Sequence, residues 1–237
     1  MTDLSGQVAL VTGASGGIGA ATAEALAAAG AHVGLTGRGT PALEAGGGRS
    51  FAAGGHAPIA PVDLAEADGI ARLAQALSSR WPALDILVHS AAVLPQLTPV
   101  TGIDQPGLSK ALTINVLATQ ALIAQFDPLL RKAADPRFLY LTTSVATAPR
   151  AFWGAYAASK AASEVLVACY AQEVRNTSKV RVAIIDPGAT RTAMRAKAYP
   201  GEDPQTVKLP AVVAQRMVTL LGEQFASPHR ERVNQPS

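Results

Sequence analysis

The sequence contains one cysteine, Cys169, in 237 residues, so a single chain cannot form an internal disulfide or a site of several thiolates. Its four histidines, His32, His56, His89 and His229, lie far apart and lack the spacing of metal ligands. Charged residues make up only 16% of the chain and hydrophobic residues 49%, which excludes a disordered protein. We therefore expect a globular protein with no metal site, in a reducing, cytoplasmic environment.

The sequence also gives little support for nucleic acid or a membrane as a partner. The net charge is only +3, and the 20 lysines and arginines form no basic run or stripe, which argues against nucleic-acid binding. The N-terminus lacks the basic start and long apolar core of a signal peptide, and no apolar run reaches membrane-spanning length, so we expect no membrane association. The length suits one folding unit, residues 1–237.

Short apolar runs alternate with stretches of helical period. The runs predict strands at Gln7–Thr12, His32–Thr36, Ala57–Val62, Leu84–His89, Arg137–Thr143 and Val180–Ile185. Helices are predicted at Gly17–Ala29, Glu66–Arg80, Pro106–Leu130, Gly154–Arg175 and Pro210–Leu221. Between Gly39 and Gly55 the glycines allow at most a short or frayed helix. This alternation predicts an α/β fold, a single-domain Rossmann-type doubly wound parallel sheet in three layers.

A glycine-rich loop follows the first predicted strand and opens the first helix. It reads Thr12-Gly13-Ala14-Ser15-Gly16-Gly17-Ile18-Gly19. Backbone N–H groups and the positive end of the helix dipole attract a pyrophosphate at such a place, and glycines permit its close approach. A purely structural turn is the alternative, but the position between strand and helix favours a cofactor site that includes Gly13, Ser15, Gly17, Ile18 and Gly19.

With this loop the sequence resembles the short-chain dehydrogenase/reductase family, whose fingerprint is Thr-Gly-x-x-x-Gly-x-Gly, and the resemblance covers nearly the whole chain. The segments 189–195 and 199–204 resemble those of the YciK-type bacterial oxidoreductases. The resemblance implies an enzyme acting on a small-molecule carbonyl or alcohol. It also implies a homodimer or homotetramer that pairs through the helices carrying Asn115 and Tyr156.

The residues after the second strand bear on the choice of cofactor. An NAD site usually has an acidic residue here, but no acid occurs before Glu44. Instead Arg38 could pair with a 2′-phosphate, with Ser15 as a second donor. This favours NADP(H) and leaves NAD(H) open, and a solvated surface arginine is the alternative.

Further cofactor contacts are implied by the resemblance alone. Asp63 and Leu64 match the position that binds the adenine, although Asp63 could instead cap a helix beginning near Glu66. Where the family usually has Asn-Asn-Ala-Gly, this chain has His89-Ser90-Ala91-Ala92, and we expect the site to survive with altered packing. Near the nicotinamide the resemblance places Pro187, Gly188, Thr190 and Thr192.

Tyr156 and Lys160 stand four residues apart on a predicted helix, so their side chains project from one face. A neighbouring ammonium favours the phenolate and suits proton exchange at the tyrosine, although such a pair also occurs by chance. Ser144 matches the family's substrate-binding serine at a strand end, with Thr143 competing and a structural serine as the alternative. Asn115 matches the family's relay asparagine, and could instead be a polar residue packed at a helix contact.

These residues predict an NADP(H)-dependent oxidoreductase. Tyr156 would give a proton to the carbonyl oxygen, Ser144 would position that oxygen, and residues 189–209 would form a loop that closes over the substrate. The substrate itself does not follow from the sequence. The alternative is a catalytically silent dinucleotide-binding sensor or scaffold, which Ser90-Ala91-Ala92 favours and the set Asn115, Ser144, Tyr156 and Lys160 disfavours.

Overall fold

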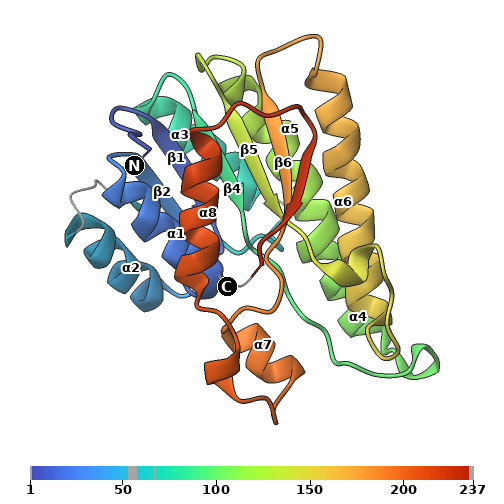
Figure 1. Cartoon of the computed structure of the whole chain (residues 1–237). Coiled ribbons are helices and arrows are strands. Elements are labelled where there is room, and N and C mark those ends of the chain that lie inside the picture. The colour runs from blue at the N-terminus through green and yellow to red at the C-terminus, as the bar shows by residue number, and fades with distance from the viewer. Residues whose placement is uncertain (1, 53–57, 67, 235–237) are drawn as a thin grey trace.

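Seven parallel strands form one sheet in the order β3-β2-β1-β4-β5-β6-β7 (Figure 1). The computed structural model describes residues 2–52, 58–66 and 68–234. The strands are β1 (Val8–Thr12), β2 (His32–Gly37), β3 (Ile59–Pro61), β4 (Ile86–His89), β5 (Arg137–Leu141), β6 (Arg181–Asp186) and β7 (His229–Arg232). The doubly wound parallel sheet predicted from the sequence is confirmed. Ala57, the predicted start of the third strand, lies outside the described residues.

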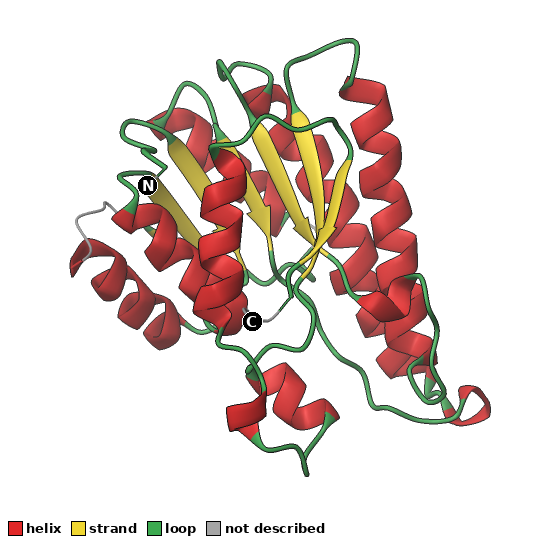
Figure 2. Cartoon of the chain, in the orientation of Figure 1, coloured by secondary structure: helices red, strands yellow, loops and turns green. Residues whose placement is uncertain are grey.

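Helices cover both faces of the sheet (Figure 2). They are α1 (Gly17–Ala28), α2 (Thr40–Ala52), α3 (Gly69–Arg80), α4 (Gln105–Leu112), α5 (Ala118–Leu130), α6 (Gly154–Val174), α7 (Ala193–Ala198) and α8 (Pro210–Leu221). In Figure 1, α1, α2 and α8 lie on one face and α3, α5 and α6 on the other, while α7 stands beyond the carboxyl ends of the strands. The three layers place ligand-binding loops at that edge.

The two faces of the sheet supply two separate cores. In β1, Ala9 and Val11 pack with the helices on the side of α1 and α8. Val8 and Leu10 point the other way and pack with residues of α3, α5 and α6. Successive side chains of a strand point to opposite faces, so a strand buried on both sides must be apolar throughout. This is why the strands read as continuous hydrophobic runs and not as alternating ones.

The connection after β2 differs from the sequence-based expectation. The helix α2 spans 13 residues, Thr40–Ala52, where we expected at most a short or frayed one. Leu43 is fully buried in the core on the α1 side, and this packing outweighs the poor helix propensity of three consecutive glycines. Gly54 and Gly55, the end of the expected loop, lie outside the described residues.

The predicted helix Pro106–Leu130 is also divided. A π-helical turn, Thr113–Leu117, separates α4 from α5, and at its end the Ala118 N–H donates to the Thr113 carbonyl. Such turns often occur at functional sites. By length and composition alone, the stretch Gln105–Leu130 could cross a membrane, contrary to the expectation that no segment would. Its side chains Leu122 and Phe126 are fully buried against the sheet, which accounts for the apolar character of that face.

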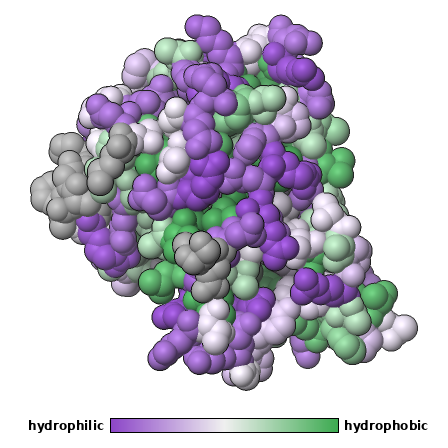
Figure 3. All heavy atoms as spheres, viewed as in Figure 1, coloured by the Kyte–Doolittle hydropathy of each residue, from purple (hydrophilic) through white to green (hydrophobic). Residues whose placement is uncertain are grey.

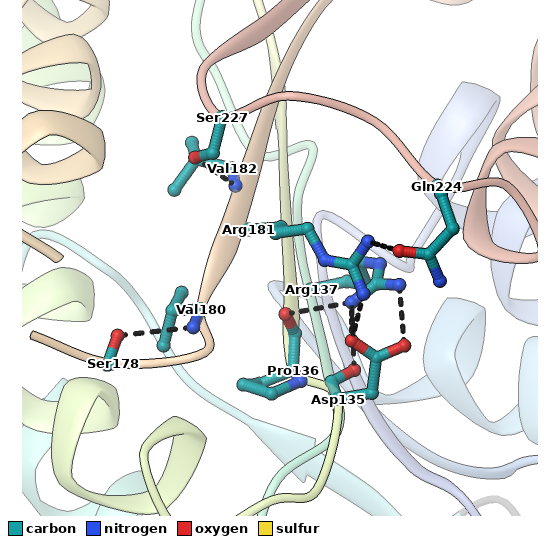
Figure 4. A network of polar contacts seen from close by, with 9 residues as sticks. All are labelled: Asp135, Pro136, Arg137, Ser178, Val180, Arg181, Val182, Gln224 and Ser227. Carbon is teal, nitrogen blue, oxygen red and sulfur yellow. Dashed lines mark hydrogen bonds and ion pairs between the residues drawn. The ribbon is translucent and has the colours of Figure 1, made fainter. Parts of the chain in front are cut away.

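The C-terminal segment adds β7, which the sequence analysis missed. It pairs with the carboxyl half of β6, from Ala183 to Asp186. The segment that leads into it is held beside the amino ends of β5 and β6 by the charged cluster in Figure 4, where the Asp135 carboxylate accepts from the guanidiniums of both Arg137 and Arg181. The Phe225 ring lies 5.5 Å from the guanidinium carbon of Arg137 and 5.9 Å from that of Arg181. Arg181 also donates to Gln224. These contacts come from residues remote in sequence, so no local pattern reveals them.

Two glycine substitutions test how far packing governs the helices. A Cβ on Gly48 of α2 would meet nothing within 4 Å, so Gly48→Ala should raise the unfolding free energy by about 0.5–1 kcal/mol, because it restricts the unfolded chain. A Cβ on Gly19 of α1 would lie 2.3 Å from the Gly13 carbonyl oxygen, so Gly19→Ala should lower it by about 1–3 kcal/mol. Urea denaturation of both variants beside wild type measures the two effects, and equal effects would contradict the packing described.

Candidate active site

A cavity of about 320 Å³ lies at the carboxyl edge of the sheet. Hydrophobic surface gathers toward this edge in Figure 3, above α7. The lining includes these predicted site residues: Gly13, Ser15, Gly17, Ile18, Arg38, Asp63, Leu64, Ser90, Ala91, Ala92, Tyr156, Lys160, Pro187 and Thr192. It also includes others that we did not predict: Gly16, Gly37, Val62, Val93, Ile114, Leu141, Thr142, Ala193 and Met194.

The glycine loop owes its shape to a close approach of three backbone segments. Gly13 has φ +70°, and a Cβ there would lie 2.8 Å from the Ala91 nitrogen and 2.9 Å from the Ala91 Cα. Gly19 in turn packs against the Gly13 carbonyl. Gly19 is not among the described lining residues of the cavity. Its role is to let α1 start close to the end of β1. A side chain at Gly13 or Gly19 would clash with backbone atoms, so these two glycines allow the ends of β1 and β4 and the start of α1 to approach closely.

Arg38 and Asp63 flank the cavity beyond the ends of β2 and β3. The Arg38 side chain is exposed. Asp63 accepts a hydrogen bond from the Ala65 N–H at 3.0 Å, while the residue preceding α3 is Asp68. The helix begins at Gly69 and not near Glu66, so Asp63 does not cap it, and its carboxylate faces the cavity edge instead.

Beyond β6, the turn after Asp186 shapes the opposite wall. The Gly188 N–H donates to Asp186 Oδ1 at 2.9 Å, and Thr190 Oγ1 donates to the Pro187 carbonyl at 3.0 Å. Gly188 and Thr190 are not among the described lining residues, because their polar groups hold the turn. Thr192 does line the cavity, and its methyl group lies 3.2 Å from where a Cβ on Gly17 would be.

Tyr156 and Lys160 are both buried in the cavity wall, at 7% and 3% exposure. Lys160 Nζ donates to the Leu141 carbonyl at 2.7 Å. Burial lowers the pKa of Lys160 to about 8, against the opposing influence of Tyr156 and Glu164. Burial raises the pKa of Tyr156, while the Lys160 charge works to lower it. The tyrosine thus holds its proton at neutral pH beside an ammonium that is still charged.

Asn115 is 1% exposed and belongs to the π-helical turn. Its Oδ1 accepts from the Val93 N–H at 2.8 Å, and its Nδ2 donates to the Val93 carbonyl at 3.0 Å and to Ser159 Oγ at 2.9 Å. Since Val93 lines the cavity, the asparagine side chain fixes the cavity wall after β4. The π turn brings this side chain inward, and the poor helix propensity of asparagine is explained by these bonds.

Ser144 lies farther from the strand than expected. The strand β5 ends at Leu141, and Ser144 opens a 3₁₀ turn, Ser144–Ala146. In the described part of the chain, neither Ser144 nor its rival Thr143 lines the cavity, whereas Thr142 does. Thr142 Oγ1 donates to the carboxylate of Glu164, which is buried at 6% exposure.

The segment expected as a substrate loop contains α7 and lies over Tyr156. The Tyr156 hydroxyl is 3.8 Å from Met194 Sδ. The guanidinium of Arg195 donates to both carboxylate oxygens of Glu202 at 2.7 and 2.6 Å and lies 3.7 Å from the centre of the Tyr199 ring. The sequence indicated that this segment covers the site, but not that Met194 reaches the hydroxyl.

Aromatic side chains continue the apolar wall from Tyr156. The Trp153 ring lies 5.9 Å from that of Tyr156 and 5.8 Å from that of Tyr199. The preceding Phe152 has φ +72°, a left-handed conformation that side chains rarely adopt and that often marks functional sites. Within the residues described, no group of three or more His, Cys, Asp or Glu side chains could hold a metal ion.

Comparison with known proteins identifies the family. The family model of the short chain dehydrogenases matches residues 7–203. The uncharacterized oxidoreductase YciK of Escherichia coli K12 is 36% identical over 223 residues, which cover 93% of this chain and 88% of YciK. A structure of a short chain dehydrogenase from Pseudomonas syringae has a TM-score of 0.93 at 35% identity, covering 98% of this chain and 96% of that one.

Another solved structure, that of a Shigella flexneri 2a short chain dehydrogenase, contains NADP. It has a TM-score of 0.93 at 34% identity, covering 98% of this chain and 99% of that one. These matches extend over the glycine loop, the cavity and the Tyr156–Lys160 pair. The chain belongs to the short chain dehydrogenases and is an oxidoreductase of the YciK type.

Proposed function

We propose that this protein is an NADP(H)-dependent reductase of small-molecule carbonyl compounds, with Tyr156 as the proton donor. The observation that carries the proposal is the placement of Tyr156 and Lys160 in the wall of the same cavity that begins at the glycine loop. In an oxidoreductase with this arrangement, bound NADPH supplies the hydride. The reverse reaction, oxidation of an alcohol, uses the same groups.

The residues of the cavity suit a dinucleotide. Gly13, Gly16 and Gly17 line the cavity at the N-terminus of α1, where backbone N–H groups and the helix dipole suit a pyrophosphate. At the adenosine end, the exposed Arg38 offers a guanidinium and no carboxylate lies before Asp63 on the lining, which suits a 2′-phosphate. Similar proteins bound to NADP or NADPH support this cofactor, while NAD(H) stays open as a weaker ligand.

Tyr156 suits the acid role in the reductive direction. Its raised pKa keeps the phenol protonated, and the Lys160 ammonium stabilises the phenolate that forms as the proton leaves. Lys160 is fixed by the Leu141 carbonyl, and Asn115 by Val93, so neither must reorganise during proton transfer. We propose that Ser144 binds the substrate oxygen. Because the Met194 sulfur lies 3.8 Å from the Tyr156 hydroxyl, the segment over Tyr156 must shift before a substrate oxygen can approach that hydroxyl.

The cofactor assignment predicts a selective effect of Arg38→Ala. Loss of a charge-assisted contact with the 2′-phosphate should weaken NADPH binding about 10-fold to 100-fold and leave NADH binding nearly unchanged. Calorimetric titration of each cofactor at one fixed salt concentration measures this. Arg80→Ala, which removes an arginine at the far end of α3, is the matched control and should change neither affinity. Equal weakening of both cofactors by Arg38→Ala would argue against a role in NADP selection.

The catalytic assignment predicts that Tyr156→Phe separates binding from turnover. This variant should still bind NADPH, because only a hydroxyl is lost, while carbonyl reduction should fall by about 100-fold to 10,000-fold. The measurement is NADPH consumption with a panel of aldehydes and ketones, paired with the calorimetric affinity. A wild type that binds NADPH but reduces no carbonyl would favour the silent sensor or scaffold instead.

We also propose that the protein is a cytoplasmic homodimer or homotetramer. The helices that carry Asn115 and Tyr156 expose the apolar side chains Leu112, Leu117 and Val165, at 38%, 62% and 61% exposure. Covering such side chains with a second copy removes apolar surface from water. Sedimentation velocity should show a dimer or tetramer that Leu117→Lys with Val165→Lys converts to monomer. A wild-type monomer at every concentration tested would contradict this.

A further inference from the structure

The buried ammonium of Lys160 rests against an aromatic ring. Its Nζ lies 4.3 Å from the centre of the Tyr140 ring in β5. The His89 ring at the end of β4 packs against the same tyrosine, with the ring centres 5.7 Å apart and the planes inclined by 43°. Tyr140 is fully buried and His89 is 1% exposed. A catalytic lysine and two aromatic residues from neighbouring strands thus form one packed unit.

Hydrogen bonds determine which nitrogen of His89 carries the proton. Thr119 Oγ1 lies 2.9 Å from His89 Nε2 and donates its only hydrogen to the Asn115 carbonyl at 2.8 Å. The threonine oxygen must therefore accept from the imidazole, so Nε2 is protonated. On the other side Nδ1 lies 2.7 Å from Thr12 Oγ1, and the bare nitrogen accepts from that hydroxyl.

The same bonds connect the ends of β1 and β4 with the π-helical turn that carries Asn115. Thr12 Oγ1 also accepts from the Ala91 N–H at 3.2 Å, and Ala91 lines the cavity beside Gly13. The chain of hydrogen bonds then runs from Ala91 through Thr12, His89 and Thr119 to the carbonyl of Asn115. Each hydroxyl along it uses its one hydrogen, so the direction of every bond is determined.

A positive charge on His89 would break this arrangement. It would need a second N–H donor toward Thr12 and would bring a second cation near Lys160. Burial and the Lys160 charge together lower the pKa of His89 to about 3, so the imidazole is neutral at neutral pH. The neutral His89 ring therefore does not repel the Lys160 ammonium.

We propose that the rings of Tyr140 and His89 form a floor that positions the Lys160 ammonium, and that His89 serves in it as the neutral, Nε2-protonated tautomer. An ammonium has three donors, and among the described contacts of Nζ the hydrogen bond to Leu141 uses one. The negative face of an aromatic ring gives a desolvated cation a further favourable contact. The ring thus keeps the ammonium charged and in place beside Tyr156. The positioning role rests on the proposed function, but the contact itself does not.

The contact has a spectroscopic signature that is independent of catalysis. The chain has six lysines, and of these Lys160 is the one placed over a ring within the described structure. In protein with ¹³C-labelled lysine, its ε-CH₂ proton resonance should be displaced upfield by the ring current, and Lys160→Arg assigns that resonance. The displacement should persist in Tyr140→Phe and disappear in Tyr140→Leu. An unshifted Lys160 resonance in the wild type would overturn the proposal.

The consequence for the reaction is tested with the same variants. Tyr140→Leu should reduce kcat on the order of 10-fold, the size expected for a desolvated cation–π contact, while Tyr140→Phe should restore most of the rate. Tyr170→Leu removes another buried tyrosine of the same core, one that contacts Phe138, and controls for lost packing. Equal losses in Tyr140→Phe and Tyr140→Leu would assign the effect to the hydroxyl and not to the ring, and equal losses in Tyr170→Leu and Tyr140→Leu would assign it to stability; either result would overturn the positioning role.

The tautomer of His89 is read from a long-range ¹⁵N–¹H spectrum of the histidine rings, with His89→Gln to assign the signals. One bare and one protonated nitrogen, with the proton on Nε2 across the whole pH range of folding, is the expected result. A His89 that titrates near the ordinary histidine pKa, or that carries its proton on Nδ1, would refute this part of the proposal. Absence of carbonyl reduction by wild type would overturn the proposed function, and these two spectra would still decide the contact and the tautomer.

Discussion

The half of the cavity that contains Tyr156 and Lys160 depends on the burial of one ammonium group. Taking a charge out of water is expensive, so the structure must surround Lys160 with groups that offset the loss of hydration. The Leu141 carbonyl, the Tyr140 ring and the nearby Glu164 carboxylate do this from β5 and α6. The ends of these elements are therefore determined by polar geometry as well as by hydrophobic packing.

The other half of the site depends on backbone proximity. Gly13 and Ala91 bring the ends of β1 and β4 so close together that no side chain fits between them. The strand pairing of β1 with β4 makes this approach possible, because Thr12 is directly opposite His89. The hydrogen-bonded His89 then joins the two halves, since it contacts Thr12 on one side and the helix of Asn115 on the other.

Local sequence patterns were sufficient to predict the sheet, the glycine loop and the Tyr156–Lys160 pair. The glycine loop and the Tyr156–Lys160 pair each lie within a few consecutive residues. Each pattern can therefore be recognised from a single strand end or a single helix. The alternation of apolar runs predicted the sheet for the same reason. The predicted length of α2 was wrong, because tertiary packing of Leu43 outweighed the poor helix propensity of the glycines. The π turn, β7 and the place of Ser144 depend on contacts between residues far apart in sequence.

The segment His89-Ser90-Ala91-Ala92, which departs from the family motif, also shows what the sequence alone cannot predict. In the sequence it reads as a defect in a cofactor motif, whereas in the structure His89 makes two hydrogen bonds and a ring contact. The partners, Thr12, Thr119 and Tyr140, come from β1, α5 and β5. Only the assembled sheet shows that the substituted residue has a complete set of neighbours.

The covering segment that bears α7 is held by bonds within itself and by contacts with the cavity wall, where Lys197 Nζ donates to the Leu94 carbonyl. Its base is closed where Thr190 pairs with Lys208, and Arg195 joins Glu202 and Tyr199 within it. A segment with internal bonds and a closed base can vary at its tip without disturbing the sheet or the buried lysine. Under the proposed function, the segment that contacts the substrate is therefore separate from the elements that hold Tyr156 and Lys160, so a change at its tip would alter substrate preference and leave the chemical mechanism unchanged.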